Sequence, residues 1–121
     1  MQLNPERNKD YTVTPTVDTT KITITGDITC CVKNGICYVS IRNCTFANAG
    51  NNQANVITGL PKSALQVSAL LSGSSASETA LVSAAGTGCW INPNDTVLNF
   101  HVGTGDDTRR HWLSLSYPVA D

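Results

Sequence analysis

The dipeptide Asn34-Gly35, set between two alternating runs, constrains the fold more than any other feature of this chain. Residues 28–33 and 36–41 each alternate apolar side chains with polar or small ones. Asn-Gly is the preferred sequence for a type I′ turn, because both central residues of that turn need a positive φ. The sequence therefore predicts an antiparallel hairpin over residues 28–41. Its two-residue loop fixes a register that pairs Val32 with Cys37, Cys30 with Val39 and Ile28 with Ile41 on one apolar face.

The rest of the chain continues in short extended segments separated by turns. No segment carries a helical period over ten or more residues, and the nearest rival, residues 63–81, contains Gly73 and several serines. The many short strands predict an all-β protein, an antiparallel β-sandwich or jelly roll of about eight strands. Further strands are expected at residues 56–63, 65–71, 79–83, 86–91, 96–101 and 111–117, with a long loop at 43–55, a turn at 92–95 and a polar loop at 103–110.

The first residues differ from the remainder of the chain. Tyr11, Val13 and Val17 alternate with threonines, and Pro15 interrupts the pattern. Proline cannot donate a ladder hydrogen bond, so this segment suits an edge strand or an arm. We interpret residues 1–19 as an N-terminal arm or linker and residues 20–121 as one β domain.

Composition and charge exclude several classes of partner. Charged residues make up 14% of the chain and the net charge is −1, which does not give the basic face that nucleic-acid binding needs. The same balance gives no attraction to an anionic membrane, and no run approaches the roughly 18 apolar residues of a transmembrane helix. Thr, Ser and Asn account for 36 of 121 residues, which is typical of an all-β surface protein.

The cysteine pattern favours free thiols. An odd number of cysteines cannot all form disulfides within one chain. The Cys-x-x-Cys spacing that is typical of zinc sites does not occur. In the predicted register Cys30 and Cys37 are diagonal neighbours, so we expect no disulfide between them. We therefore expect no metal and folding in a reducing compartment. The five cysteines are Cys30, Cys31, Cys37, Cys44 and Cys89.

Motifs for catalysis or cofactor binding are missing from the sequence. No Gly-x-Ser-x-Gly elbow is present, and the adjacent acids Asp106 and Asp107 are more typical of a solvated turn than of a glycosidase pair. Gly103-Thr-Gly105 lacks the lysine and the helix of a phosphate loop. We expect neither an enzyme nor a cofactor.

One cluster of polar and aromatic residues points to ligand binding. Four charged residues fall within five positions of the 103–110 loop, in a chain with little charge elsewhere, and two tryptophans and a histidine lie in the neighbouring strands. Aromatic rings stack on the C–H faces of sugars, while carboxylates and guanidinium groups bond their hydroxyls. Alternation directs His111 and Trp112 to opposite faces of their strand, and we favour Trp112 for the site. The alternative is that the tryptophans belong to the core and the charged loop is ordinary protein surface. The candidate residues are Trp90, His101, Asp106, Asp107, Arg109, Arg110 and Trp112.

The order of these segments resembles the C-terminal head domain of phage tail-fibre and baseplate receptor-binding proteins. The resemblance covers residues 20–121 and rests on the hairpin Cys31–Ser40, the step Thr58-Gly-Leu-Pro61, the strand and turn at Trp90-Ile91, and the terminal strand Trp112–Tyr117. It implies a β-sandwich or jelly-roll head that assembles as a homotrimer with other virion proteins. It also implies a virion component of the tail or baseplate, assembled in the host cytoplasm, that binds a bacterial cell-surface saccharide.

Two other functions are compatible with the sequence. The first is a structural virion protein without a ligand, such as a baseplate or capsid decoration protein. The second is the carbohydrate-binding module of a bacterial enzyme. Free cysteines and the lack of an apolar signal-peptide core in residues 1–18 count against the second.

Overall fold

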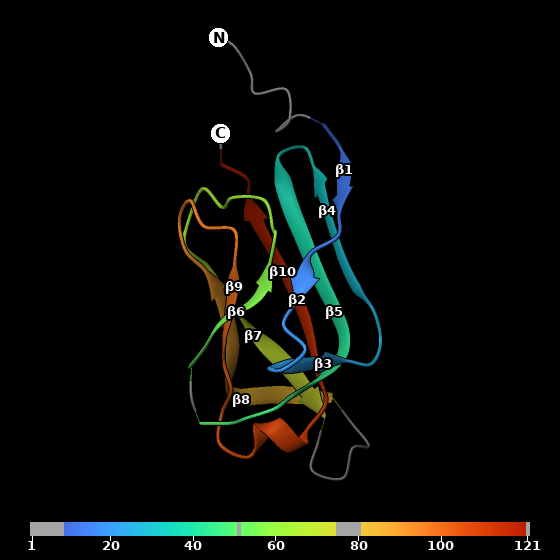
Figure 1. Ribbon diagram of the computed structural model, residues 1–121, viewed down its shortest axis with the longest axis vertical. Coiled ribbons are helices and arrows are strands. Elements are labelled where there is room, and N and C mark those ends of the chain that lie inside the picture. Colours follow the sequence, from blue (N-terminus) through green and yellow to red (C-terminus); the bar gives the residue numbers. More distant parts are fainter. Residues whose placement is uncertain (1–8, 51, 75–80, 121) are drawn as a thin grey trace.

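The computed structural model describes residues 9–50, 52–74 and 81–120 of the chain (Figure 1). Within these ranges the protein consists of β-strands and one short 3₁₀ helix, which confirms the expected all-β class. No helix in them is long and apolar enough to cross a membrane. The elements are β1 (Tyr11–Val13), β2 (Thr16–Val17), β3 (Ile22–Ile24), β4 (Ile28–Lys33), β5 (Ile36–Phe46), β6 (Asn52–Thr58), β7 (Val67–Ser74), β8 (Leu81–Ile91), β9 (Leu98–His101), η1 (Asp106–Thr108) and β10 (His111–Pro118).

The strands form one curled antiparallel sheet that resembles half of a barrel (Figure 1). It is a 10-stranded sheet in the order β1-β4-β5-β10-β7-β8-β9-β6-β2, with β3 paired to β5. The expected two-sheet sandwich or jelly roll of about eight strands is therefore wrong. A sandwich needs a break between two sheets, whereas β10 bonds to both β5 and β7 and carries the ladder from one half of the sheet to the other.

Irregular positions in the ladder accompany the curl. The pairing shifts register between His111 and Leu113 in β10, between Gln53 and Ile57 in β6, and between Leu70 and Ser72 in β7. Such bulges bend a strand and increase its twist, so one sheet can wrap around a single core. Alternation in the sequence does not show these shifts, and this is why it could not separate one curled sheet from two stacked ones.

The hairpin β4–β5 has the predicted register. Val32 pairs with Cys37, Cys30 with Val39 and Ile28 with Ile41, as expected. The turn residues Asn34 and Gly35 have φ values of 50° and 77°, which a type I′ turn requires. The apolar face of the hairpin packs into the core, and its other face is directed outward.

Strand β5 extends beyond the hairpin to Phe46, where β3 pairs with it. The predicted loop at 43–55 is therefore wrong in both of its bounds. Its first residues belong to β5, which ends at Phe46, and its last residues belong to β6, which begins at Asn52. Asn43 has a φ of 64°, and the backbone N–H groups of Thr25 and Gly26 both donate to its carbonyl oxygen. A Cβ atom on Gly26 would overlap the carbonyl oxygen of Arg42, so only glycine fits where the chain passes from β3 to β4.

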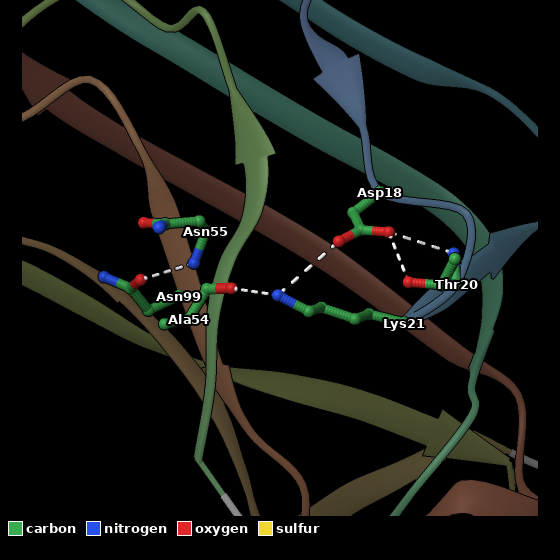
Figure 2. Close-up of polar contacts among 6 residues, drawn as sticks. All are labelled: Asp18, Thr20, Lys21, Ala54, Asn55 and Asn99. Atoms are coloured by element: carbon green, nitrogen blue, oxygen red, sulfur yellow. Dashed lines mark hydrogen bonds and ion pairs between the residues drawn. The ribbon is translucent and has the colours of Figure 1, made fainter.

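The N-terminal segment covers both edges of the sheet. β1 pairs with β4 and β2 pairs with β6, with Pro15 between them, which confirms the expected edge strand. After β2, the N–H of Asp18 donates to the carbonyl oxygen of Val56 over 2.8 Å. Lys21 Nζ donates to the carbonyl oxygen of Ala54 over 2.7 Å (Figure 2). The Asp18 carboxylate lies 3.5 Å from Lys21 Nζ and accepts two hydrogen bonds from Thr20. These hydrogen bonds keep the pKa of Asp18 below its usual range.

The core lies inside the curl and receives side chains from both halves of the sheet. Phe46 of β5 and Phe100 of β9 have ring centroids 5.3 Å apart. Tyr117 of β10 is buried, and its hydroxyl donates to the carbonyl oxygen of Pro61 over 2.8 Å. Residues 67–74 are a strand, so the helical reading of 63–81 does not hold there; residues 75–80 lie outside the described ranges.

Candidate functional site

The connection between β9 and β10 carries four of the seven candidate residues. The two strands are not paired with each other, because β9 pairs with β6 and β8 while β10 pairs with β5 and β7. The connection contains η1, which follows Gly105 at a φ of 84°. Arg109 N donates to the carbonyl oxygen of Asp106 over 3.1 Å, and Thr108 Oγ1 donates to that of Gly105 over 2.9 Å. These local bonds fold the connection into a compact turn at one end of the sheet.

Asp106 is buried and anchors this turn to β8. Its carboxylate accepts a hydrogen bond from Thr87 Oγ1, and the same hydroxyl accepts one from Gly103 N over 2.9 Å. His111 Nε2 lies 2.8 Å from the carbonyl oxygen of Asp106. A buried carboxylate needs hydrogen-bond donors to offset its desolvation, and Thr87 supplies one. The Asp106 carboxylate is thus engaged inside the protein.

His111 is a buried structural partner of the turn. Its ring centroid lies 5.3 Å from that of Phe46. Because the Asp106 carbonyl can only accept, Nε2 carries the proton, and Nδ1 has no hydrogen-bond partner among the described residues. His111 is buried beside Leu113, while Trp112 is directed to the other face, which confirms the expected alternation.

The remaining charged candidates lie nearer the surface of the turn. Asp107, Arg109 and Arg110 are all half-buried. The bonds from Thr87 to Asp106 and from Gly103 to Thr87 place the turn beside the section of β8 that begins at Gly86.

A depression that is open to solvent lies on the outer face of β7, β8 and β9, next to the part of β8 that begins at Gly86. Its volume is about 390 Å³, near the lower end of ligand-binding pockets, and its lining is mostly apolar. Two of the predicted site residues, Trp90 and His101, contribute to it. The lining residues are Ser68, Ala69, Leu70, Gly86, Gly88, Cys89, Trp90 and His101.

Glycines in β8 create the depression. Gly88 pairs with Leu70 on one side and with His101 on the other, so a gap separates the two side chains. A Cβ atom on Gly88 would lie 3.0 Å from the carbonyl oxygen of Ala69 and 3.5 Å from Leu70 Cδ2. Gly86 has a φ of 82°, which side-chain-bearing residues rarely adopt. The floor of the depression is therefore largely backbone.

His101 is held at the rim of the depression by β6. Its Nδ1 lies 2.8 Å from Asn52 Oδ1, and the two residues are cross-strand partners. The amide oxygen of Asn52 can only accept, so Nδ1 donates, and in the neutral ring Nε2 is a hydrogen-bond acceptor. The exposed imidazole thus has a defined orientation and tautomer.

The two tryptophans lie on the same outer face, on either side of Leu70. Trp90 is paired with Ser68, and Trp112 of β10 is paired with Ser72. The register makes both rings diagonal neighbours of Leu70, although Trp112 does not line the depression itself. The structure thus groups Trp90, His101 and Trp112 on one face and places the charged candidates in the turn at its end.

Leu70 and Asn52 are site residues that the sequence analysis missed. Leu70 is 70% exposed, the highest value among the large hydrophobic residues of the described ranges. A signal for it was present, because Ala69-Leu70-Leu71 breaks the alternation of this strand. The pair Gly86 and Gly88 beside Trp90 was a second signal, since glycine within a strand often marks a close approach by a ligand or another backbone. Nothing in the sequence pointed to Asn52, whose role depends on a pairing between distant strands.

The thiols offer no second site. All five cysteines are free, and Cys30 and Cys37 lie side by side in the core with their sulfur atoms 3.6 Å apart. The hydrogen bond between the two thiols raises the pKa of Cys30 and lowers the pKa of Cys37. Burial raises the pKa of Cys44 and Cys89 to about 12. In the described part of the chain, no three His, Cys, Asp or Glu residues are grouped to hold a metal ion.

Comparisons with known proteins do not assign this site. No protein-family model matches the chain, and no curated protein or solved structure matches it either. The chemistry of the outer face and of the adjoining turn is what points to a function.

Proposed function

We propose that the chain is the receptor-binding head domain of a phage virion and that it binds a saccharide on the host cell surface. The observation that carries this proposal is the depression over Gly88, where Trp90 and Leu70 lie beside an oriented His101. Sugars present apolar C–H faces and polar edges, so their sites combine an exposed ring with fixed hydrogen-bonding groups. This face of the protein offers both.

We assign polar contacts of the proposed site to the turn between β9 and β10, whose residues do not line the depression itself. Asp107 provides a carboxylate acceptor, and Arg109 provides a guanidinium fork with several donors. The buried hydrogen bond between Asp106 and Thr87 attaches the turn to β8. The backbone that carries Asp107 and Arg109 is therefore ordered. A loop fixed on a rigid sheet is the usual carrier of binding residues.

Binding to host cells and to a glycan array tests the proposal. We expect Trp90→Ala, Asp107→Ala and Arg109→Ala each to weaken saccharide or cell binding at least tenfold, which is about 1.4 kcal/mol. The matched control is Leu65→Ala, because Leu65 is an exposed hydrophobic residue that does not line the depression. The melting temperature of each variant reports whether the fold is intact.

The proposal is overturned if all four variants bind as tightly as the wild type and their melting temperatures are unchanged. Failure of the wild-type protein to bind any glycan or host cell would instead favour a structural virion protein of the baseplate or capsid.

We also propose that the head assembles as a homotrimer within the tail or baseplate. Support comes from β10, whose outer face carries the exposed small residues Ser114 and Ser116 beside Trp112 and can pack closely against a neighbouring subunit. The low net charge leaves little repulsion between copies. Light scattering at micromolar concentration tests this assembly, and a monomeric mass would contradict it.

A further inference from the structure

A row of directly paired residues crosses the outer face of the sheet, from Asn52 in β6 through His101 in β9 and Gly88 in β8 to Leu70 in β7. Residues that are directly opposite each other in a ladder share a face, so Asn52 and His101 are both directed outward. His101 is exposed and lines the depression, whereas Asn52 lies behind it and does not. A ligand in the depression can therefore contact the imidazole that the amide supports.

Asn52 determines which edge of the His101 ring a ligand meets. Nδ1 lies 2.8 Å from Asn52 Oδ1, so this corner of the ring is directed toward β6. The edge of an imidazole opposite Nδ1 consists of Cδ2 and Nε2. Because β8 lies on the other side of β9 from β6, that edge is directed toward β8 and the depression. Nε2 is therefore the ring nitrogen that a ligand can reach.

The same hydrogen bond determines the chemical character of Nε2. Which ring nitrogen carries the proton is set by the bond that the other one makes, and the amide oxygen of Asn52 can only accept. The neutral ring thus presents a lone pair at Nε2. Trp90, which also lines the depression, can only donate through its indole N–H. A ligand group placed at His101 must be a donor, and a hydroxyl meets that need whereas an ether oxygen does not.

We propose that Asn52 is a positioning residue of the saccharide site, which holds His101 so that Nε2 accepts a hydrogen bond from a sugar hydroxyl. This inference rests on the proposed saccharide-binding function and adds to it one defined contact between ligand and protein. The contact needs both the orientation and the tautomer of the ring, and a single bond to Asn52 supplies the two.

NMR of the full chain without a ligand tests the positioning role. Long-range ¹H–¹⁵N spectra identify the tautomer in alkaline solution, which keeps imidazole side chains neutral, and the signals of His101 are those lost in His101→Gln. We expect the proton on Nδ1 in the wild type. Asn52→Asp should retain this tautomer, because a carboxylate also only accepts, whereas Asn52→Ala should shift it toward Nε2–H.

The matched control is Gln53→Ala, which removes the amide of the next residue in β6. Gln53 is paired with Phe100 rather than with His101, so this variant should leave the tautomer unchanged. The melting temperature of each variant separates a change in the ring from a change in the fold.

Titration with methyl glycosides of glucose, galactose, mannose and N-acetylglucosamine tests the contact itself. We expect at least one of them to shift the Nε2 resonance of His101 in the wild type. Asn52→Ala should weaken its binding by about fivefold or more, the scale of one hydrogen bond, while Asn52→Asp and Gln53→Ala stay within about twofold of the wild type.

An Nε2–H tautomer in the wild type, or an unchanged tautomer in Asn52→Ala, overturns the inference. A glycoside whose binding depends on Trp90 but leaves the Nε2 resonance in place also overturns it, and the proposed function then stands. Host-cell binding decides the matter if none of the glycosides binds. Equal cell binding by the wild type and Asn52→Ala overturns the inference alone, whereas equal cell binding by the wild type and Trp90→Ala overturns the proposed function with it.

Discussion

The two halves of the sheet obey the sequence rules to different degrees. In the β4–β5 hairpin every pair follows the alternation, and the inner face is apolar while the outer face is mainly polar. In β7–β8–β9 the register shifts after Leu70, two glycines replace side chains in β8, and a leucine stands exposed on the outer face. The candidate site lies in this second, irregular half.

The difference shows two roles that a strand can have, one in stability and one in function. A regular hairpin stabilises the fold through its inner face, and its outer face can change with little effect. A strand that departs from the rules loses some stability, and such departures are expected at functional positions. If the hairpin provides stability and the irregular half provides binding, substitutions in the two halves should change different measurements.

The largest effect on stability is expected in the regular half. Ile41 is fully buried and pairs with both Ile28 and Leu113, so Ile41→Ala removes core contacts and leaves a cavity. We expect the free energy of unfolding to fall by about 2–5 kcal/mol. Urea denaturation measures it, and saccharide binding by the folded fraction should be unchanged. Leu70→Ala is the counterpart in the irregular half, where we expect a change within about 0.5 kcal/mol. Equal losses in the two variants would contradict the division between the halves.

The second prediction concerns the anchor of the turn between β9 and β10. Thr87→Val keeps the shape of the side chain but leaves the Asp106 carboxylate and the N–H of Gly103 without the hydroxyl they share. We expect a loss of about 1–3 kcal/mol in unfolding free energy, together with weaker binding. Thermal denaturation and cell binding give the two readouts. The control is Thr108→Val, whose hydroxyl bond to Gly105 is exposed and should contribute less; a larger effect in the control would contradict the role given to Thr87.

The third prediction addresses the turn of the hairpin. Gly35 has a φ of 77°, and a β-branched residue in that conformation is strained. We expect Gly35→Val to lower the free energy of unfolding by about 1–2 kcal/mol, with saccharide binding retained. Chemical denaturation checks the first part and the glycan array the second. Loss of binding in a folded Gly35→Val protein would show that the regular half also supports the site.

The sequence determined the regular half almost completely and the site only in part. The Asn34-Gly35 turn predicts its own register, because the interacting residues are neighbours along the chain. Trp90 and His101 were selected from the sequence because they lie in the strands next to the charged 103–110 loop. The inward position of Asp106 and the support of His101 by Asn52 depend on strands far apart in sequence, and local patterns do not contain that information.

The smallest expected effect belongs to the polar turn after β2, which lies outside both halves. Hydrogen bonds from Thr20 keep the pKa of Asp18 below its unfolded value of about 3.9. The ionised carboxylate therefore stabilises the fold above that pH, and the contribution disappears as the pH falls through the lower folded pKa. We expect Asp18→Asn to melt slightly below the wild type at pH 7 and at the same temperature near pH 2. A difference that persists in acid would contradict this origin.

The placement of β1 and β2 has a consequence for copies of the protein that are crowded together. Each outermost strand is short, with β1 covering Tyr11–Val13 and β2 covering Thr16–Val17, and Pro15 between them has no N–H to offer. An open sheet edge with a long row of unpaired backbone groups recruits strands from other molecules and leads to aggregation. Here a single segment of the chain shields β4 at one edge and β6 at the other. The protein thereby limits edge-to-edge polymerisation and leaves its outer faces available for specific contacts.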